Sequence, residues 1–112
     1  METPTYNYAV SLNGLQRFEE AKSLLRKTMP VTRRILREGN RLTLALRKHY
    51  AEALFAPKNA SQDDQREAVA VLADDAKARR RIFGTNHPTT IRALQTLERA
   101  RMRLEDVDAP LS

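Results

Sequence analysis

Two histidines, His49 and His87, are the side chains best suited to acid–base or metal chemistry in this sequence. They belong to different predicted helices, and neither has a carboxylate at the spacing of a metalloprotease helix. The chain has no cysteine, so a thiolate metal site, a cysteine nucleophile and a disulfide framework are excluded. It also has no glycine-rich phosphate loop and no nucleophile elbow. The residue types therefore indicate a protein that is not an enzyme and that uses no metal ion or cofactor.

Each histidine also has a structural interpretation. His87 directly precedes Pro88, and proline is favoured at the first position of a helix, so we interpret His87 as a helix cap. His49 either lines a binding groove or lies on a solvated helix face, and the sequence leaves both interpretations open.

The charge of the chain indicates an acidic partner. Its net charge is +6, from 20 Lys and Arg against 14 Asp and Glu, which favours a protein, a nucleic acid or an anionic membrane surface. Two groups of cations precede predicted helix ends, where the helix dipole stabilises positive charge. They are Arg33, Arg34 and Arg37, and then Lys77, Arg79, Arg80 and Arg81.

The class of partner can be narrowed. Nucleic-acid binding favours aromatic platforms between the cations, and only three Tyr and three Phe are present, most of them needed in a core. No predicted helix pairs a basic face with exposed large apolar residues, and no segment is long and apolar enough to span a bilayer. The first twelve residues lack the pattern of a signal peptide. A protein partner and a cytoplasmic location are therefore expected.

An internal repeat organises the chain. Tyr8-Ala9 returns as Tyr50-Ala51, 42 residues later. Beyond residue 54 the offset between matching segments grows by five residues, which places an enlarged loop at residues 56–62. Self-similarity of this period is typical of helical-repeat proteins.

Periodicity and stop signals predict five helices, at residues 6–12, 18–37, 41–55, 63–84 and 88–105. The Asn13-Gly14 turn ends the first, and Pro30 kinks the second without breaking it. Asn40 and Ser61 are the expected caps of the third and fourth helices. The core is expected to contain Tyr8, Leu12, Leu25, Tyr50, Leu54, Leu72 and Leu94, with Ile91, Leu97 and Leu104 also facing inward.

Short turns make successive helices antiparallel, so the expected fold is all-α: a right-handed stack of helical hairpins. A single domain is expected at residues 6–105, with hairpins at 6–37 and 41–84 and a closing helix at 88–105. Residues 1–5 are expected to be disordered and residues 106–112 frayed.

The repeat units resemble tetratricopeptide repeats, and specifically the 42-residue variety typified by kinesin light chain. The resemblance rests on the large-small pairs Tyr8-Ala9 and Tyr50-Ala51, on Phe18-Glu19-Glu20-Ala21-Lys22-Ser23-Leu24-Leu25, and on the junction Arg80-Arg81-Ile82-Phe83-Gly84-Thr85-Asn86-His87-Pro88-Thr89-Thr90. The chain departs from the family at residues 34–43, where the His-Pro pair is missing. Glu98 occupies a position that is small in the family, so the fifth helix is expected to present the polar outer face of a capping helix.

The resemblance implies a protein–protein interaction module, an adaptor or scaffold that binds a peptide or a partner helix on its concave face. In the family the first helix of each hairpin lines the groove, which gives the partner-binding residues Tyr6, Asn7, Val10, Lys48, His49, Glu52, Arg92, Gln95, Thr96 and Arg99. Lys48, Arg92 and Arg99 make this set basic, so an acidic peptide is expected. The alternatives are a basic RNA-binding repeat protein and a purely structural, self-associating repeat fragment, with a homo-oligomer possible.

Overall fold

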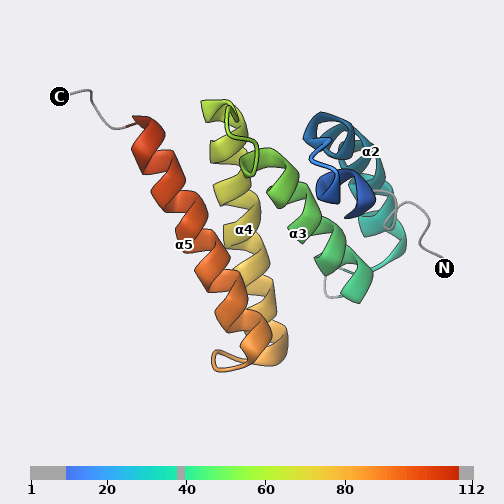
Figure 1. Cartoon of the computed structure of the whole chain (residues 1–112). Coiled ribbons are helices and arrows are strands. Elements are labelled where there is room, and N and C mark those ends of the chain that lie inside the picture. The colour runs from blue at the N-terminus through green and yellow to red at the C-terminus, as the bar shows by residue number, and fades with distance from the viewer. Residues whose placement is uncertain (1–9, 38–39, 109–112) are drawn as a thin grey trace.

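The computed structural model describes residues 10–37 and 40–108, and their side chains as far as residue 105. All regular secondary structure in these ranges is helical. Residues 10–14 are followed by α2 (Phe18–Ile35), α3 (Arg41–Phe55), α4 (Gln62–Phe83) and α5 (Pro88–Asp108). Figure 1 shows these helices side by side in chain order, with the chain reversing direction at each turn. The predicted all-α stack of antiparallel helices is confirmed.

The first turn differs from the prediction. Residues 10–14 are helical through Asn13 and Gly14, and the chain turns at Leu15 and Gln16 instead. Gln16 takes up the left-handed conformation there, with φ of 60°. The side-chain amide Nδ2 of Asn13, within the helical residues, donates a hydrogen bond to the backbone oxygen of His49 at 3.1 Å.

The starts of α3 and α4 are capped as predicted. Asn40 Oδ1 accepts a hydrogen bond from the backbone N–H of Leu42 at 2.8 Å, and Ser61 Oγ accepts from Asp64 N–H at 3.0 Å. Each cap gives a partner to a backbone donor that the first helical turn leaves unpaired.

The junction between α4 and α5 also follows its sequence signals. Gly84 ends α4 with φ of 99°, a conformation that side chains with a Cβ rarely adopt. His87 Nδ1 accepts a hydrogen bond from Thr89 N–H at 3.0 Å, so the prediction of a histidine cap is confirmed. The ring of Phe83 also contacts the ring of His87, with their centroids 4.8 Å apart.

Helix α2 continues through Pro30, as predicted. On either side of the proline, Thr28 Oγ1 donates to Leu24 O and Thr32 Oγ1 donates to Thr28 O. These contacts supply side-chain donors to the helix carbonyls around Pro30, which has no N–H of its own. The helix ends at Ile35 rather than at residue 37, because Leu36 is extended with ψ of 154°. The kink itself stays a prediction.

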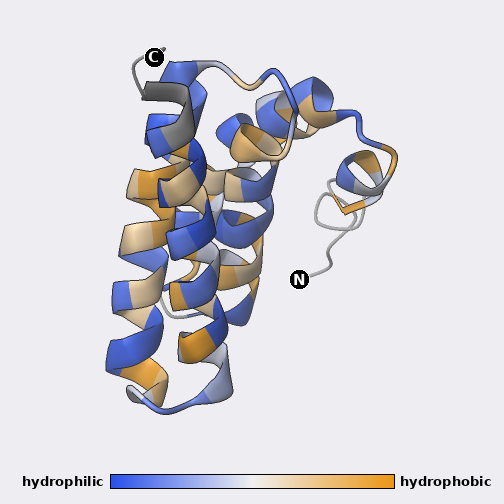
Figure 2. Cartoon of the chain, turned by 60° about the vertical axis from the view of Figure 1, so that its left-hand side comes forward, coloured by the Kyte–Doolittle hydropathy of each residue, from blue (hydrophilic) through white to orange (hydrophobic). Residues whose placement is uncertain are grey.

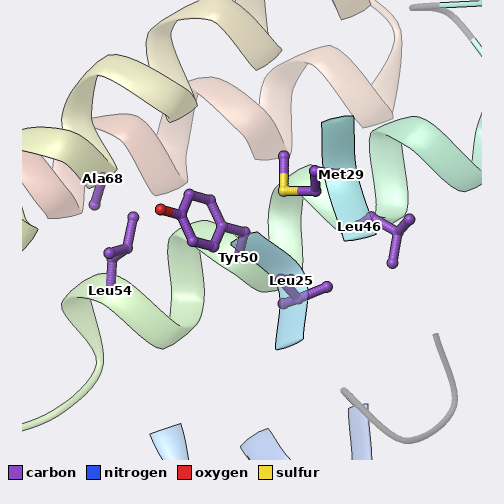
Figure 3. Packing of buried hydrophobic residues seen from close by; sticks show 6 residues of the cluster. All are labelled: Leu25, Met29, Leu46, Tyr50, Leu54 and Ala68. Atoms are coloured by element: carbon purple, nitrogen blue, oxygen red, sulfur yellow. The ribbon is translucent and has the colours of Figure 1, made fainter. Parts of the chain in front are cut away.

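The core joins α2, α3 and α4. Figure 3 shows Tyr50 with its neighbours in one cluster of buried side chains, which consists of Leu25, Met29, Leu46, Tyr50, Leu54 and Ala68. Leu12 and Leu72 are buried as well. The predicted core is thus confirmed for Leu12, Leu25, Tyr50, Leu54 and Leu72, and Tyr8 lies outside the described residues.

The predicted phase of α5 is wrong in part. Leu94 and Ile91 are 38% and 42% exposed, whereas Leu97 is buried as predicted and Leu104 is half-buried. The helix packs on α4 through a mostly small face instead, made of Thr90, Ala93, Leu97 and Ala100. Small side chains at a helix face allow a neighbouring helix to approach closely. α5 also runs to Asp108, past its predicted end at about residue 105.

Candidate functional site

A basic groove lies over α4, between α3 and α5. It consists of two hollows, of about 90 Å³ and 280 Å³, that share the lining residues Lys48, Arg79 and Thr89. The smaller hollow is also lined by Leu72, Asp75, Arg92, Ala93 and Thr96, and the larger by Arg41, Leu44, Ala45, His49 and Phe83. The shared residues join the two hollows into one depression, which we call the groove.

Four of the ten predicted partner-binding residues line the groove. They are Lys48 and His49 from α3 and Arg92 and Thr96 from α5. Arg92 and Thr96 are four residues apart, and residues at this spacing lie on the same face of an α-helix.

The other predicted residues lie elsewhere. Val10 is exposed on the helical residues 10–14, and Glu52, Gln95 and Arg99 line neither hollow. Arg99 lies next to the groove, because its guanidinium donates to Thr96 Oγ1 at 3.2 Å. Tyr6 and Asn7 lie outside the described residues.

Arg79 lines the groove but is outside the predicted partner-binding set, as are Arg41 and Thr89. Its Nε donates to Asp75 Oδ2 at 2.8 Å and its Nη2 donates to the backbone oxygen of Leu44 at 3.2 Å. These bonds join α4 to α3. In the sequence, the i,i+4 spacing of Asp75 and Arg79 is the signal that could have set Arg79 apart from the other cations near the end of its helix.

Asp75 lines the smaller hollow and holds Arg79 in place there. Its side chain is 3% exposed and also lies 3.9 Å from the equally buried guanidinium of Arg47. Burial raises the pKa of Asp75, although the charges of Arg79 and Arg47 oppose that rise. A buried carboxylate between two guanidinium groups is a positioning group, and its charge is not available to a ligand.

The exposed charge of the groove is positive. Arg41, Lys48 and Arg92 are exposed at its walls, and no carboxylate of the described residues forms an ion pair with them. The nearby acid Glu52 is engaged by His49, whose Nδ1 lies 3.6 Å from Glu52 Oε1, and this contact lowers the pKa of Glu52. A concave surface with cations at its walls attracts anionic ligands.

The remaining cations do not form a second continuous surface with aromatic platforms. Lys77, Arg80 and Arg81 are exposed on α4, and Arg33, Arg34 and Arg37 at the end of α2. Of the aromatic side chains that the structure describes, Phe83 alone is exposed. Stacking of successive bases would need several such rings.

The largest hollow, about 700 Å³, lies between the start of α2 and the loop that joins α3 to α4. Its acids and bases bind one another: Arg17 Nε lies 2.6 Å from Glu20 Oε1, and Lys22 Nζ lies 2.7 Å from Asp64 Oδ2. Most of the charges that line this hollow are therefore paired with one another.

Two kinds of feature are absent from the part of the chain that the structure describes. No group of three or more His, Asp or Glu side chains there could hold a metal ion. Among its helices, none is both long enough and apolar enough to cross a membrane.

Comparison with known proteins identifies one repeat. A protein-family model described as a tetratricopeptide repeat matches residues 60–89, which contain α4 and its junction with α5. No curated protein and no solved structure matches the chain. Together with the antiparallel stack, the match supports a tetratricopeptide repeat at residues 60–89 within an all-α helical-repeat fold. Such a repeat suggests a module for protein–protein interaction.

Proposed function

We propose that this chain is a cytoplasmic adaptor or scaffold module of the kinesin light chain type that binds an acidic peptide segment, or an acidic face of a partner helix, in the groove. The observation that carries the proposal is the presence of the cations Lys48, Arg79 and Arg92 around one concavity. The tetratricopeptide repeat at residues 60–89 supports a protein partner.

The three cations have different roles in this proposal. Lys48 and Arg92 are exposed, so they contribute long-range attraction and can adjust to the ligand. Arg79 is held by Asp75 and by the Leu44 carbonyl, so its guanidinium is oriented before a ligand arrives. A pre-oriented guanidinium loses little freedom when it binds a carboxylate, and such charge-assisted hydrogen bonds are strong. Arg99, next to Thr96, extends the basic wall along α5.

Nucleic-acid binding is the second candidate, and the net charge of +6 favours it. The exposed arginines at the ends of α2 and α4 would contact phosphates. The dependence of affinity on salt separates the two candidates. When a ligand is held by several phosphate contacts, its affinity falls by about three or more decades as salt rises from about 50 to 200 mM. The affinity for a short acidic peptide falls much less over the same range.

The test uses fluorescence anisotropy with a labelled oligoglutamate peptide, the corresponding oligoglutamine peptide and a single-stranded RNA. We expect binding of oligoglutamate with a shallow salt dependence and no binding of oligoglutamine. Tight binding of RNA with a steep salt dependence, and none of oligoglutamate, would establish the second candidate instead.

Paired charge reversals then locate the site. Lys48→Glu with Arg92→Glu should weaken oligoglutamate binding by at least about tenfold, which corresponds to about 1.4 kcal/mol. The matched control is Lys77→Glu with Arg80→Glu, which changes the net charge equally on exposed positions of α4. If the control weakens binding as much as the groove variant, the groove is not the site.

A further inference from the structure

The smaller hollow of the groove gathers positive charge from three helices. Lys48 of α3, Arg79 of α4 and Arg92 of α5 all line it, together with the carboxylate of Asp75. Asp75 Oδ2 accepts a hydrogen bond from Arg79 Nε at 2.8 Å, so this carboxylate offsets one of the three cations. The residues that line this hollow of about 90 Å³ therefore carry a net charge of +2.

The wall that α5 contributes to the smaller hollow is polar. Thr89, Arg92 and Thr96 follow one another at intervals of three and four residues, so they share one face of the helix. Thr89 lies in the first turn of α5, where the helix dipole favours an anion, and its hydroxyl can donate a hydrogen bond. Arg99 extends this wall, because its Nη2 donates to Thr96 Oγ1 at 3.2 Å. Figure 2, in which α5 comes forward, shows that hydrophilic stretches recur along this helix.

The charge and size of the smaller hollow match a phosphate monoester better than a carboxylate. An aspartate or glutamate side chain brings one negative charge and two oxygens, whereas a phosphorylated serine or threonine brings about −1.5 to −2 at pH 7 and three strong acceptor oxygens. A tetrahedral phosphate accepts hydrogen bonds from several directions, which suits cations that come from three helices. The hollow has the volume of about three water molecules, at about 30 Å³ each, which is room for one phosphate group.

We infer that the smaller hollow binds the phosphate group of a phosphorylated serine or threonine in the partner peptide. This inference rests on the proposed function, because it names the group that the groove recognises in its peptide ligand. Arg79 is held in place by Asp75 and by the Leu44 carbonyl, whereas the exposed Lys48 and Arg92 adjust to the phosphate. The larger hollow adjoins the smaller one and gives the flanking peptide a surface to lie on.

The phosphates inside an RNA strand match the smaller hollow less well. Each of them is a diester with one negative charge and two non-bridging oxygens, and binding of a strand uses many such groups in succession. Single-stranded RNA also gains affinity from aromatic rings on which its bases stack, and Phe83 alone is exposed among the aromatic side chains that the structure describes. A phosphopeptide is therefore the ligand that the hollow favours.

Fluorescence anisotropy with the full chain tests the inference. One labelled acidic peptide is used in four forms, with phosphoserine, glutamate, serine or two adjacent glutamates at its centre. We expect the phosphoserine form to bind at least about tenfold more tightly than the glutamate form. The form with two glutamates carries a similar charge to the phosphoserine form and should bind at least about threefold less tightly than that form, because its oxygens are not arranged around one centre.

The outcomes separate this inference from the proposed function. Equal affinity of the phosphoserine form and either glutamate form overturns the inference and leaves the binding of acidic peptides intact. Absence of binding by all four forms and by oligoglutamate overturns both.

A neutral substitution locates the phosphate. Arg92→Gln removes one cation from an exposed position of the wall and should lower the ratio of the affinities for the phosphoserine and glutamate forms by at least about fivefold. The matched control is Arg80→Gln at an exposed position of α4, which should leave this ratio within about twofold. An unchanged ratio in Arg92→Gln, or an equal fall in both variants, overturns the inference.

Competition identifies the source of the phosphate. Inorganic phosphate should displace the labelled phosphoserine peptide only at a concentration at least about a hundredfold above that of the unlabelled peptide, and single-stranded RNA without a terminal phosphate should not displace it. Displacement by inorganic phosphate as readily as by the unlabelled peptide would assign the hollow to the free ion. Displacement by RNA at an equal concentration of phosphate groups would assign it to nucleic acid, and either result overturns the inference.

Discussion

At the scale of single residues, one polar cluster ties three helices together. Lys22 and Arg26 of α2 contact Asp64 and Glu67 of α4, and the hydroxyl of Tyr50 on α3 lies between Arg26 and Glu67. Burial raises the pKa of Tyr50, and the Glu67 carboxylate raises it further. The tyrosine therefore stays protonated, so its hydroxyl donates to Glu67 and accepts from Arg26.

The apolar core predicts a large cost for Leu54→Ala. Leu54 is fully buried between α2, α3 and α4, so truncation leaves a cavity and should lower the free energy of unfolding by about 2 to 5 kcal/mol. Urea denaturation followed by circular dichroism measures the loss. Leu15→Ala is the control, because Leu15 is 66% exposed and its truncation should change stability by less than about 0.5 kcal/mol. A loss below about 1 kcal/mol for Leu54→Ala contradicts the packing described here.

The contact between His49 and Glu52 predicts a measurable pKa. His49 holds the pKa of Glu52 below its ordinary value. Ionised Glu52 therefore stabilises the fold at pH values above the ordinary glutamate pKa, and this stabilisation is lost as the pH falls through the lowered pKa. Titration of the Glu52 carboxyl carbon by NMR should show the lowered pKa, and His49→Gln should raise it toward the ordinary value. An unchanged titration in His49→Gln would show that the histidine is not the cause.

At the scale of elements, α5 shows how a helix chooses its buried face. Its large apolar residues Ile91 and Leu94 would favour one side, yet Ala93, Leu97 and Ala100 make the contact with α4. The loop between α3 and α4 is also attached to α5, because the Arg103 guanidinium donates to the backbone oxygens of Phe55 and Pro57. Both contacts depend on where the neighbouring backbone lies.

Two leucines three residues apart test the phase of α5. In dilute solution, Leu97→Ala should lower the free energy of unfolding by about 2 to 5 kcal/mol, because Leu97 is buried against α4. Leu94→Ala should cost less than about 1 kcal/mol, since the side chain is exposed. The reverse order of the two losses, measured by the same urea titration, would mean that α5 is rotated about its axis.

The caps make a prediction about helix ends. Ser61→Ala removes the acceptor of the Asp64 N–H at the start of α4 and should lower the free energy of unfolding by about 1 kcal/mol. Ser61→Asp keeps an acceptor and should retain most of the stability. Equal losses in thermal denaturation of the two variants would show that the cap contributes nothing.

At the scale of the whole molecule, the groove combines residues of three helices. It lies over α4, with Lys48 and His49 of α3 on one side and Arg92 and Thr96 of α5 on the other. Leu94→Gln should leave the affinity for oligoglutamate within about twofold, because Leu94 lines neither hollow. A larger loss, measured by fluorescence anisotropy, would mean that the binding surface extends beyond the groove.

The sequence by itself determined helices α2 to α5, their starts to within a residue, and most of the core. Asn40, Ser61 and His87 cap through contacts within three residues, so these signals can be recognised without knowledge of the fold. The large buried residues of α2 and α3 were found because their periodicity agrees with their packing.

The tertiary structure alone decided which side of α5 is buried and which cations share the groove. Leu94 is exposed because Ala93, Leu97 and Ala100 make the contact with α4 instead, and this choice depends on the surface of the other helix. Arg79 enters the groove because Asp75 and the backbone of Leu44 hold it there, and Leu44 is 35 residues away along the chain. Local sequence patterns specify the helices, because the contacts that form and cap a helix lie within one or two of its own turns. Contacts between helices select the faces and the site, because they depend on shapes and charges that come together only when the chain folds.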